Sequence, residues 1–226
     1  MNLPKNNIKR GVFLLAKKNT TCRYCGSNQL SKILSLGSHP PSNSFVSADQ
    51  IALEKRYPLD VYLCEKCFLV QLLDVVPAEA IFSDYVYLSS SSKALKDHYA
   101  QLANYLTTRF LLKEGDRVVD VGCNDCILLH GYSSPYLVKI GVEPSKLAEI
   151  AKAAGMEVVN AFFSREVAKS MLNGYGTAKL ITATNVFAHV DDIKSFVEGV
   201  VLLLADNGVF VVGMVHLQKV IPCSIT

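Results

Sequence analysis

The chain has 226 residues, of which 50% are apolar and 19% are charged, and its formal net charge is +3. This composition excludes an intrinsically disordered protein and allows a small module followed by a medium-sized domain. The basic residues are dispersed rather than clustered, so we expect no nucleic-acid partner. No apolar run resembles a transmembrane segment or a signal peptide, so we expect a cytoplasmic protein without a membrane partner.

Three stretches of the sequence differ in composition and in hydrophobic pattern. Residues 1–20 are polar and basic without a period, and we expect them to form a loose arm. Residues 21–88 combine paired cysteines, several prolines and short mixed segments, which is typical of a small module organised by a metal. Residues 89–226 alternate helical and strand patterns, which predicts an α/β domain of the Rossmann-like kind.

Four cysteines of the first module form two CxxC pairs, Cys22 with Cys25 and Cys64 with Cys67. In a cytoplasmic chain, cysteines indicate metal or thiol chemistry rather than disulfides. The two-residue spacing lets two thiolates converge on one ion, and Gly26 suits a tight turn after the first pair. Two such pairs predict a closed Cys₄ site for structural zinc, with no open position for a substrate. The alternative is four buried free cysteines.

The second domain is predicted to begin with a helix. Apolar residues from Leu95 to Phe110 repeat at steps of three and four, and the tract Ser89–Ser92 offers N-caps. Strands are predicted over Arg117–Val121, Val138–Val142, Glu157–Val159, Leu180–Ala183 and Val209–Val215. The intervening helices are predicted from about Asp125 and after the caps Ser145, Ser164 and Asp191. This alternation predicts an open doubly wound sheet.

Two of these helices have a predicted inward face. We expect the helix after Ser145 to bury Leu147, Ile150, Ala151 and Ala154, and the helix after Asp191 to bury Ile193, Phe196, Val197 and Val200.

The first strand runs into a turn that contains Gly122, and the second strand ends at Glu143. Ligands of open α/β sheets bind at the carboxyl ends of the strands, where an acidic residue about 20 positions after the turn accepts hydrogen bonds from a ribose. The phosphate-binding fingerprint GxGxxG is incomplete, because Cys126 stands where a further glycine is expected. The pattern therefore favours S-adenosylmethionine over NAD. The alternative is an ordinary strand–turn–helix with Glu143 as a solvated cap.

The same turn contains a third CxxC, Cys123-Asn124-Asp125-Cys126. By itself it is compatible with a redox dithiol, but its position in the cofactor turn is the favoured explanation. Farther along, Asn185 and His189 follow the fourth strand and are four residues apart, so they would share one helical face at the same edge of the sheet. His189 is a candidate general base or substrate ligand, and the alternative is a hydrogen-bonded structural histidine.

The chain resembles the sugar C-methyltransferases in six segments, which are in order CRYCGS, YPLDVYLCEKCFLVQL, FSDYVYLSSSS, VVDVGCNDCILL, GVEPS and TATNVFAHVDD. These are bacterial S-adenosylmethionine-dependent enzymes of deoxysugar biosynthesis with an N-terminal zinc-binding domain. The resemblance extends from about Cys22 to Val212. It implies a class I methyltransferase domain and a nucleotide-linked 4-keto-6-deoxysugar substrate, methylated at the carbon beside the ketone.

The resemblance also implies roles for individual residues. The cofactor would be bound by Gly122, Asn124, Glu143 and Asn185, the sugar by Tyr85, Tyr87 and Asn185, and the catalytic groups would be His189 and Tyr87. For the two tyrosines the alternative is ordinary packing in a core or an interface.

Two departures from the family pattern lead to a further expectation. The family motif N-D-G reads Asn124-Asp125-Cys126 here, so the tight turn carries a side chain and weaker cofactor binding is expected. The family's Tyr-His-Glu-His motif, which supplies its catalytic base, is not found after Val212. We therefore expect that the domain at residues 89–226 is truncated and that its sheet is incomplete at the C-terminal side. We also expect little or no activity. The apolar edge strand would then favour self-association.

Two other classes of function stay open on the sequence. One is a non-catalytic zinc-containing binding module with the α/β part as its scaffold. The other is a remnant whose only property is affinity for S-adenosylmethionine. Binding of S-adenosylmethionine would distinguish the enzyme and the remnant from the zinc-containing module. Turnover would then distinguish the enzyme from the remnant.

Overall fold

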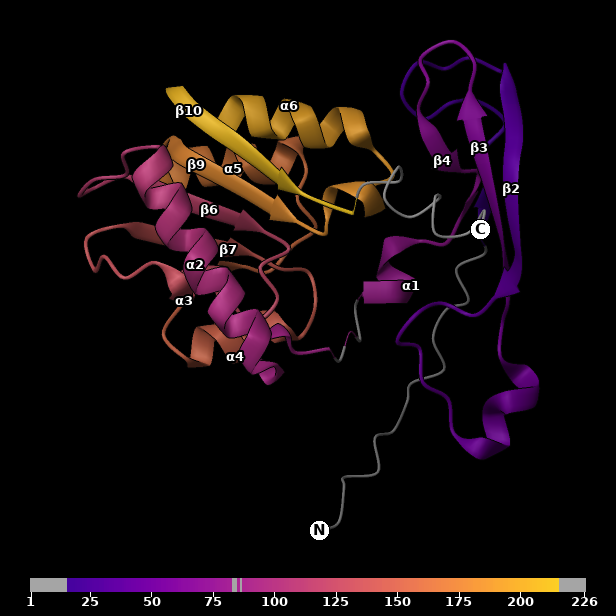
Figure 1. Cartoon of the computed structure of the whole chain (residues 1–226), viewed down its shortest axis with the longest axis horizontal. Coiled ribbons are helices and arrows are strands. Elements are labelled where there is room, and N and C mark those ends of the chain that lie inside the picture. The colour runs from indigo at the N-terminus through magenta and orange to yellow at the C-terminus, as the bar shows by residue number, and fades with distance from the viewer. Residues whose placement is uncertain (1–15, 83–84, 86, 216–226) are drawn as a thin grey trace. The chain divides into compact units, whose positions relative to one another are not determined.

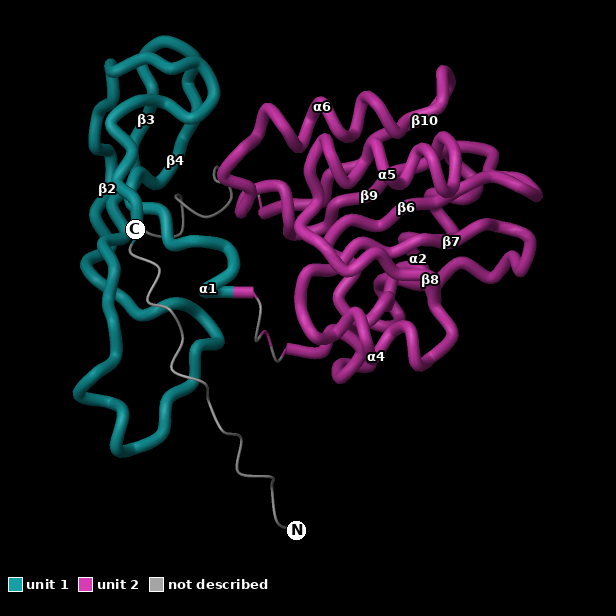
Figure 2. Tube along the Cα trace, turned by 180° about the vertical axis from the view of Figure 1, so that it is seen from behind, with its two compact units in different colours: residues 1–81 teal, residues 82–226 magenta. Residues whose placement is uncertain are grey.

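The computed structural model describes residues 16–82, 85 and 87–215. The polypeptide divides into two compact units, residues 1–81 and residues 82–226, which are teal and magenta in Figure 2. The predicted domain boundaries after residues 20 and 88 stay predictions, and most of the predicted arm lies outside the described residues.

The first unit is built on a three-stranded antiparallel sheet with the order β2-β3-β4 (Figure 1). Its strands are β2 (Leu30–His39), β3 (Tyr57–Cys64) and β4 (Val70–Leu72), and a separate two-stranded pair joins β1 (Lys17–Lys18) to β5 (Asp74–Val75). In the sequence, the 3-10 helix η1 (Ala48–Leu53) separates β2 from β3, and the short helix α1 (Ala78–Phe82) follows β5.

This unit has a very small apolar core. Among the described residues up to Ile81, the buried apolar side chains are those of Cys22, Cys64 and Leu73, and two of these three are cysteines. A core of that size does not offset the conformational entropy lost when a module of this length folds. Cross-linking by a metal is the stabilisation that such a module needs.

The second unit contains a five-stranded parallel sheet with the order β10-β9-β6-β7-β8. The strands are β6 (Arg117–Val121), β7 (Val138–Val142), β8 (Glu157–Val159), β9 (Ala178–Thr184) and β10 (Leu204–Gly213). The first three match the predicted ranges. The order reverses beside β6, so this sheet has the doubly wound topology that the sequence predicted, with its switch point between β6 and β9.

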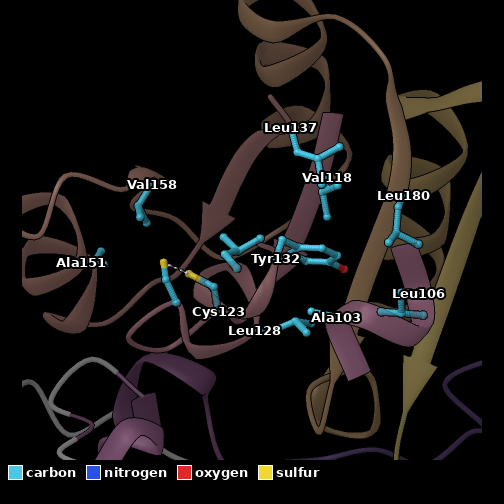
Figure 3. Packing of buried hydrophobic residues seen from close by; sticks show 13 residues of the cluster. Ala103, Leu106, Val118, Cys123, Leu128, Tyr132, Leu137, Ala151, Val158 and Leu180 are labelled. Atoms are coloured by element: carbon cyan, nitrogen blue, oxygen red, sulfur yellow. Dashed lines mark hydrogen bonds between the residues drawn. The ribbon is translucent and has the colours of Figure 1, made fainter. Parts of the chain in front are cut away.

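Helices cover both faces of this sheet (Figure 1). They are α2 (Lys93–Arg109), α3 (Ile127–Gly131), α4 (Leu147–Ala153), α5 (Arg165–Tyr175) and α6 (Ile193–Leu203), and the 3-10 helix η2 (Ser89–Ser91) precedes α2. One buried cluster joins the sheet to α2, α3 and α4, and Figure 3 shows Tyr132 at its centre. A second cluster joins the sheet to α5 and α6. No helix within the described residues is long and apolar enough to span a membrane.

Two of the predicted caps are present, and two are shifted by one residue. The hydroxyl of Ser92 accepts a hydrogen bond from Leu95 N, and that of Ser164 accepts one from Val167 N. The predicted cap Asp191 is wrong, because Asp192 caps α6 by accepting from Ser195 N. An N-cap carboxylate must reach the amide three positions on, and Asp192 is the residue at that distance. The predicted cap Ser145 is also wrong, because Lys146 is the N-cap of α4, although the Ser145 hydroxyl accepts a hydrogen bond from Leu147 N at 3.2 Å.

The predicted inward faces are partly wrong. Ile150 of α4 is 53% exposed, Ala154 at the end of α4 is exposed, and Val197 of α6 is 40% exposed, whereas Ala148 and Leu203 are buried. In α6 the buried residues Phe196, Val200 and Leu203 follow steps of four and three, and Val197 lies about 100° around the helix from Phe196. An apolar residue beside a narrow buried stripe is therefore predicted to be buried from its sequence, although it faces solvent in the folded helix.

The last strand begins earlier than predicted. β10 starts at Leu204 rather than at Val209, and the turn-forming residues Asp206, Asn207 and Gly208 lie within it. The register with β9 shifts there, because Leu204 is opposite Ala178 and Val209 is opposite Leu180. An irregularity of this kind lets turn-forming residues sit inside an edge strand.

Candidate cofactor site and metal centre

The structure brings the four cysteines of the first unit together. One sulfur atom from each of Cys22, Cys25, Cys64 and Cys67 lies within 4.8 Å of all the others. The Sγ atoms of Cys22 and Cys67 are 3.6 Å apart, as are those of Cys25 and Cys64. Four sulfurs at about 2.3 Å from a tetrahedral zinc ion would be about 3.8 Å from one another, so the arrangement fits this ion.

Each CxxC pair is shaped by the same backbone turn. Gly26 N donates to Cys22 O at 2.9 Å, and Phe68 N donates to Cys64 O at 2.8 Å. The residue after each second cysteine has a left-handed backbone, with φ of 72° at Gly26 and 62° at Phe68. The first turn therefore uses glycine, as predicted, and the second forces a bulky residue into a conformation that costs energy.

Local donors favour the thiolate form of Cys22. Burial raises the pKa of the Cys22 thiol, but hydrogen bonds from the backbone of Cys25 and Tyr24 and from the Gln71 side chain outweigh it and lower the pKa to about 6. Gln71 is 3% exposed, and its Oε1 atom accepts from Arg23 N at 3.1 Å. Sequence reasoning missed Gln71, whose only signal is a polar residue inside a short apolar strand.

The predicted cofactor turn begins where β6 ends. Gly122 has φ of 70°, which glycine adopts at little cost. A Cβ atom at Gly122 would lie 2.3 Å from Cγ2 of Val186, which follows β9. Glycine is thus required here by the packing of Val186 as well as by the backbone, a reason that the sequence alone did not supply.

The carboxylate of Glu143 faces this turn from the end of β7. Its Oε2 atom accepts a hydrogen bond from Asn124 N, and its Oε1 atom accepts one from Ser145 N, each at 2.9 Å. Glu143 is only 6% exposed, and the amide of Asn160 donates to its backbone carbonyl at 2.7 Å. The carboxylate is therefore a buried and oriented acceptor, not a solvated cap.

The third CxxC points into the core. Cys126 has φ of 62° and precedes α3, so it occupies a left-handed position that favours glycine. The Cys123 and Cys126 sulfurs are 3.5 Å apart, and Figure 3 shows this contact near Val158 and Ala151. The contact with Cys126 and burial together raise the pKa of Cys123, which disfavours a reactive dithiol.

Asp120 is a buried carboxyl group on β6 that sequence reasoning did not single out. It is 2% exposed, and its Oδ1 atom accepts a hydrogen bond from Thr182 Oγ1 at 2.6 Å. Burial raises its pKa to about 7; the Thr182 hydrogen bond opposes this shift, and the charge of Glu143 adds to it. The available signal was an acidic residue inside an otherwise apolar strand.

Four rings from the predicted substrate side form an aromatic row, made of Phe82, Tyr85, Tyr87 and His189. The ring centroids are 6.1 Å apart for Phe82 and His189, 5.8 Å for Phe82 and Tyr85, and 6.5 Å for Tyr85 and Tyr87. The ring of Phe82 therefore contacts both Tyr85 and the predicted His189, and Tyr87 joins the row through Tyr85. Sequence reasoning missed Phe82.

The predicted helical face shared by Asn185 and His189 is wrong. Asn185 has a left-handed backbone with φ of 57°, and only the short 3-10 helix η3 (Phe187–His189) follows it. Asn185 N donates to Gly213 O at 2.7 Å, which ties the loop to β10. This tertiary hydrogen bond overrides the helical spacing.

The fold and the site define a Rossmann-like protein with a buried acidic residue at the cofactor edge of its sheet. Residues 93–220 match the family described as "Methyltransferase domain", so the chain belongs to this family. Residues 22–82 match the family described as "Putative zinc binding domain". These matches confirm the predicted fold class and the predicted cofactors, S-adenosylmethionine and zinc.

A similar protein supports the narrower resemblance. The C-methyltransferase NovU of Streptomyces niveus is 31% identical over 202 residues, which are 88% of this chain and 48% of NovU. The chain thus spans about half the length of this curated relative.

Among solved structures, the plantazolicin methyltransferase BpumL in complex with a desmethylPZN analog and SAH has a TM-score of 0.46 and 12% identity, over 61% of this chain and 54% of that one. A methyltransferase from Clostridium acetobutylicum has a TM-score of 0.40 and 20% identity, over 51% and 48% of the two chains.

Proposed function

We propose that the chain binds S-adenosylmethionine at the turn after β6 and serves the C-methylation of a nucleotide-linked 4-keto-6-deoxysugar. The methyltransferase family match supports the cofactor, and the similarity to NovU supports the sugar class. The observation that carries the cofactor site is the hydrogen bond of 2.9 Å from Asn124 N to Glu143 Oε2. It shows that the turn and the acidic residue face each other.

Glu143 is suited to hold a ribose. A carboxylate has about four lone-pair positions. Backbone donors occupy two of them, one at each oxygen. The other two can accept hydrogen bonds from the 2′- and 3′-hydroxyls of an adenosine. These bonds would form in a largely water-excluded place, where they are stronger than in solvent.

The aromatic row supplies the groups for the substrate side. When bound, S-adenosylmethionine supplies an electrophilic methyl group on a sulfonium centre. The sugar must lose the proton beside its ketone, and His189 and Tyr87 are the candidate bases. His189 is exposed and lies beside Phe82, so its imidazole can reach a bound sugar. Tyr85, Tyr87 and Asn185 would bind and orient the sugar ring.

In the first unit, Cys22, Cys25, Cys64 and Cys67 would hold the zinc ion. A site closed by four thiolates leaves no coordination position for a substrate. The ion would therefore stabilise the module and take no part in methyl transfer.

Calorimetric titration with S-adenosylhomocysteine tests the cofactor site. We expect wild-type protein to bind and Glu143→Gln to bind at least about tenfold more weakly, because hydrogen bonds to a charged acceptor contribute about 1.5–3 kcal/mol. Glu149→Gln is the matched control, since it removes an exposed carboxylate of α4. Absence of binding by the wild type, or equal binding by Glu143→Gln, would contradict the assignment.

Turnover with labelled S-adenosylmethionine and a 4-keto-6-deoxysugar nucleotide tests the substrate. Methyl incorporation at carbon would support the proposed reaction, and the expectation of little or no activity would then be wrong. Binding of the cofactor without incorporation from any such sugar would favour a cofactor-binding remnant. No binding of either ligand would favour a non-catalytic zinc-containing module.

We also propose self-association through β10. Among the described residues, β10 pairs with β9 on one side and with no strand on the other. An open strand edge can pair with another chain. Sedimentation velocity over a hundredfold range of concentration should reveal larger species, and a single monomeric species throughout would contradict this.

A further inference from the structure

A short segment of the second unit is hydrogen-bonded onto the cofactor turn. Asn124 Nδ2 donates to Tyr87 O at 2.9 Å, and Asn124 Oδ1 accepts from Ser89 N at 3.0 Å. Asp125 Oδ2 accepts from Ser90 N, also at 3.0 Å. We call residues 87–90 the tethered segment. Its three hydrogen bonds cross 35 to 37 positions of sequence, so they are tertiary contacts rather than local turn bonds.

The side chain of Asn124 is already largely committed to these contacts. Its Oδ1 atom accepts from Asp125 N as well as from Ser89 N, both at 3.0 Å, which uses both acceptor positions of an amide oxygen. One Nδ2 hydrogen is used by Tyr87 O. The side chain therefore has one Nδ2 hydrogen left for a further partner, and the role of Asn124 in cofactor binding stays a prediction.

The backbone of Asn124 has a different partner. Its N–H donates to the carboxylate of Glu143, which is the proposed ribose acceptor. With φ of 54° the residue is left-handed, a conformation that asparagine tolerates better than most residues. This conformation lets one residue present its amide to Glu143 and its side chain to the tethered segment.

The amides of Ser89 and Ser90 need partners from outside their own turn. They begin the 3-10 helix η2, and the first N–H groups of a helix have no intrahelical acceptor. No side chain caps η2 locally, because its N-cap residue is Leu88. Asn124 and Asp125 therefore accept the hydrogen bonds of the first N–H groups of η2, as the side chain of an N-cap residue does in an ordinary helix.

We propose that Asn124 and Asp125 are positioning residues that hold the tethered segment, and with it Tyr87, on the cofactor turn. This inference rests on the proposed function, because the roles of Glu143 as ribose acceptor and of Tyr87 as substrate residue are part of that proposal. Cofactor binding fixes the turn and thereby orders the segment that carries Tyr87. By linkage, the cofactor then raises the affinity of the chain for the sugar by the same factor as the sugar raises affinity for the cofactor.

Hydrogen exchange of the Ser89 and Ser90 amides measures the tether directly. In the cofactor-free chain, we expect Asn124→Ala to speed exchange at Ser89 about tenfold or more, because the amide loses the acceptor Asn124 Oδ1. Asn124→Asp keeps the oxygen for Ser89 N and should restore its protection. Asp125→Ala should affect Ser90 more than Ser89.

The control is Asp116→Ala, which removes a similar side-chain acceptor at the opposite end of β6, where Asp116 Oδ2 accepts from Lys113 N. It should leave exchange at Ser89 and Ser90 unchanged. Unfolding midpoints of all variants separate loss of the tether from global destabilisation. Equal protection of Ser89 in the wild type and in Asn124→Ala would overturn the tether.

The same measurement with saturating S-adenosylhomocysteine tests the coupling. We expect the ligand to slow exchange at Ser89 and Ser90 several-fold in the wild type, and to do so much less in Asn124→Ala at a ligand concentration that saturates this variant as well. Binding without any change in exchange would overturn the coupling and leave the proposed function standing. Failure of the wild type to bind would contradict the proposed function and with it the coupling, whereas the tether is judged independently in the cofactor-free chain.

Discussion

Phe68, Asn124 and Cys126 are non-glycine residues with left-handed backbone conformations, and each lies in a turn of a candidate site. Such residues cost about 1–3 kcal/mol and persist only where the surrounding structure imposes them. At Asn124 this conformational cost is offset by the hydrogen bonds to Glu143 and the tethered segment. At Cys126 it is offset by complete burial of the side chain. Phe68 is 73% exposed, so its ring contributes little in return.

Phe68→Gly should therefore stabilise the first unit. We expect a gain of about 1 kcal/mol in the free energy of unfolding of the zinc-loaded chain, because glycine adopts the left-handed conformation without a Cβ clash. Phe68→Ala is the control, because it removes the ring and keeps the backbone cost. Equal stabilities of the two variants in urea unfolding would show that the ring, and not the backbone, governs this position.

The raised pKa of Asp120 predicts a pH-dependent stability. Between its unfolded value near 3.8 and its folded value of about 7, the folded chain keeps a proton that the unfolded chain releases. The contribution of Asp120 to the free energy of unfolding is therefore fully present below about pH 4 and is lost as the pH rises through 7. Asp120→Asn removes this loss, so its stability relative to the wild type should rise by about 2 kcal/mol from pH 5 to pH 7.

Urea unfolding at both pH values checks this, with Asp116→Asn as a control on the exposed turn before the same strand. A pH-independent difference between Asp120→Asn and the wild type would mean that Asp120 is ionised in the folded chain throughout this range.

At the scale of the element, the caps and the strands follow local rules. Ser92 and Ser164 were identified as caps because a hydroxyl before an apolar helical pattern accepts from the third amide of the helix. The ranges of β6 and β7 were predicted because buried parallel strands are short continuous apolar runs. Asp191 and Asp192 are adjacent and chemically identical, so the sequence offered no basis for choosing the true cap.

These two aspartates give a matched pair of variants. Asp192→Ala should cost about 1 kcal/mol of stability, because Ser195 N loses its acceptor at the start of α6. Asp191→Ala should change stability by less than about 0.5 kcal/mol, the usual range for a surface substitution. Thermal or urea unfolding of both variants is the measurement, and a larger loss for Asp191→Ala would refute the assignment of the cap.

At the scale of the whole molecule, the two units differ in what stabilises them. The second unit has two buried clusters, one on each face of its sheet. The described part of the first unit buries few apolar side chains besides its cysteines. Structural zinc contributes on the order of 10 kcal/mol to small cysteine-rich modules. Chelation of the metal should therefore unfold the first unit and leave the second folded.

Alkylation mapped by mass spectrometry checks this prediction. A strong chelator should expose the Cys₄ set of the first unit to iodoacetamide, whereas Cys123 and Cys126 stay protected until the chain is denatured, because both are buried in the second unit. Labelling of Cys123 together with the first set would mean that the second unit depends on the metal.

The sequence by itself determined the α/β class, the alternation of strands and helices, the paired cysteines and the acidic residue at the end of β7, because each of these depends on spacing along the chain. Only the tertiary structure decided that Val186 packs on Gly122, that Phe82 lies beside His189, and that the Asn124 side chain forms hydrogen bonds with the tethered segment. The physical reason is that hydrogen bonds and packing between distant segments depend on where side chains and carbonyls point after folding, and periodicity carries no information about that direction.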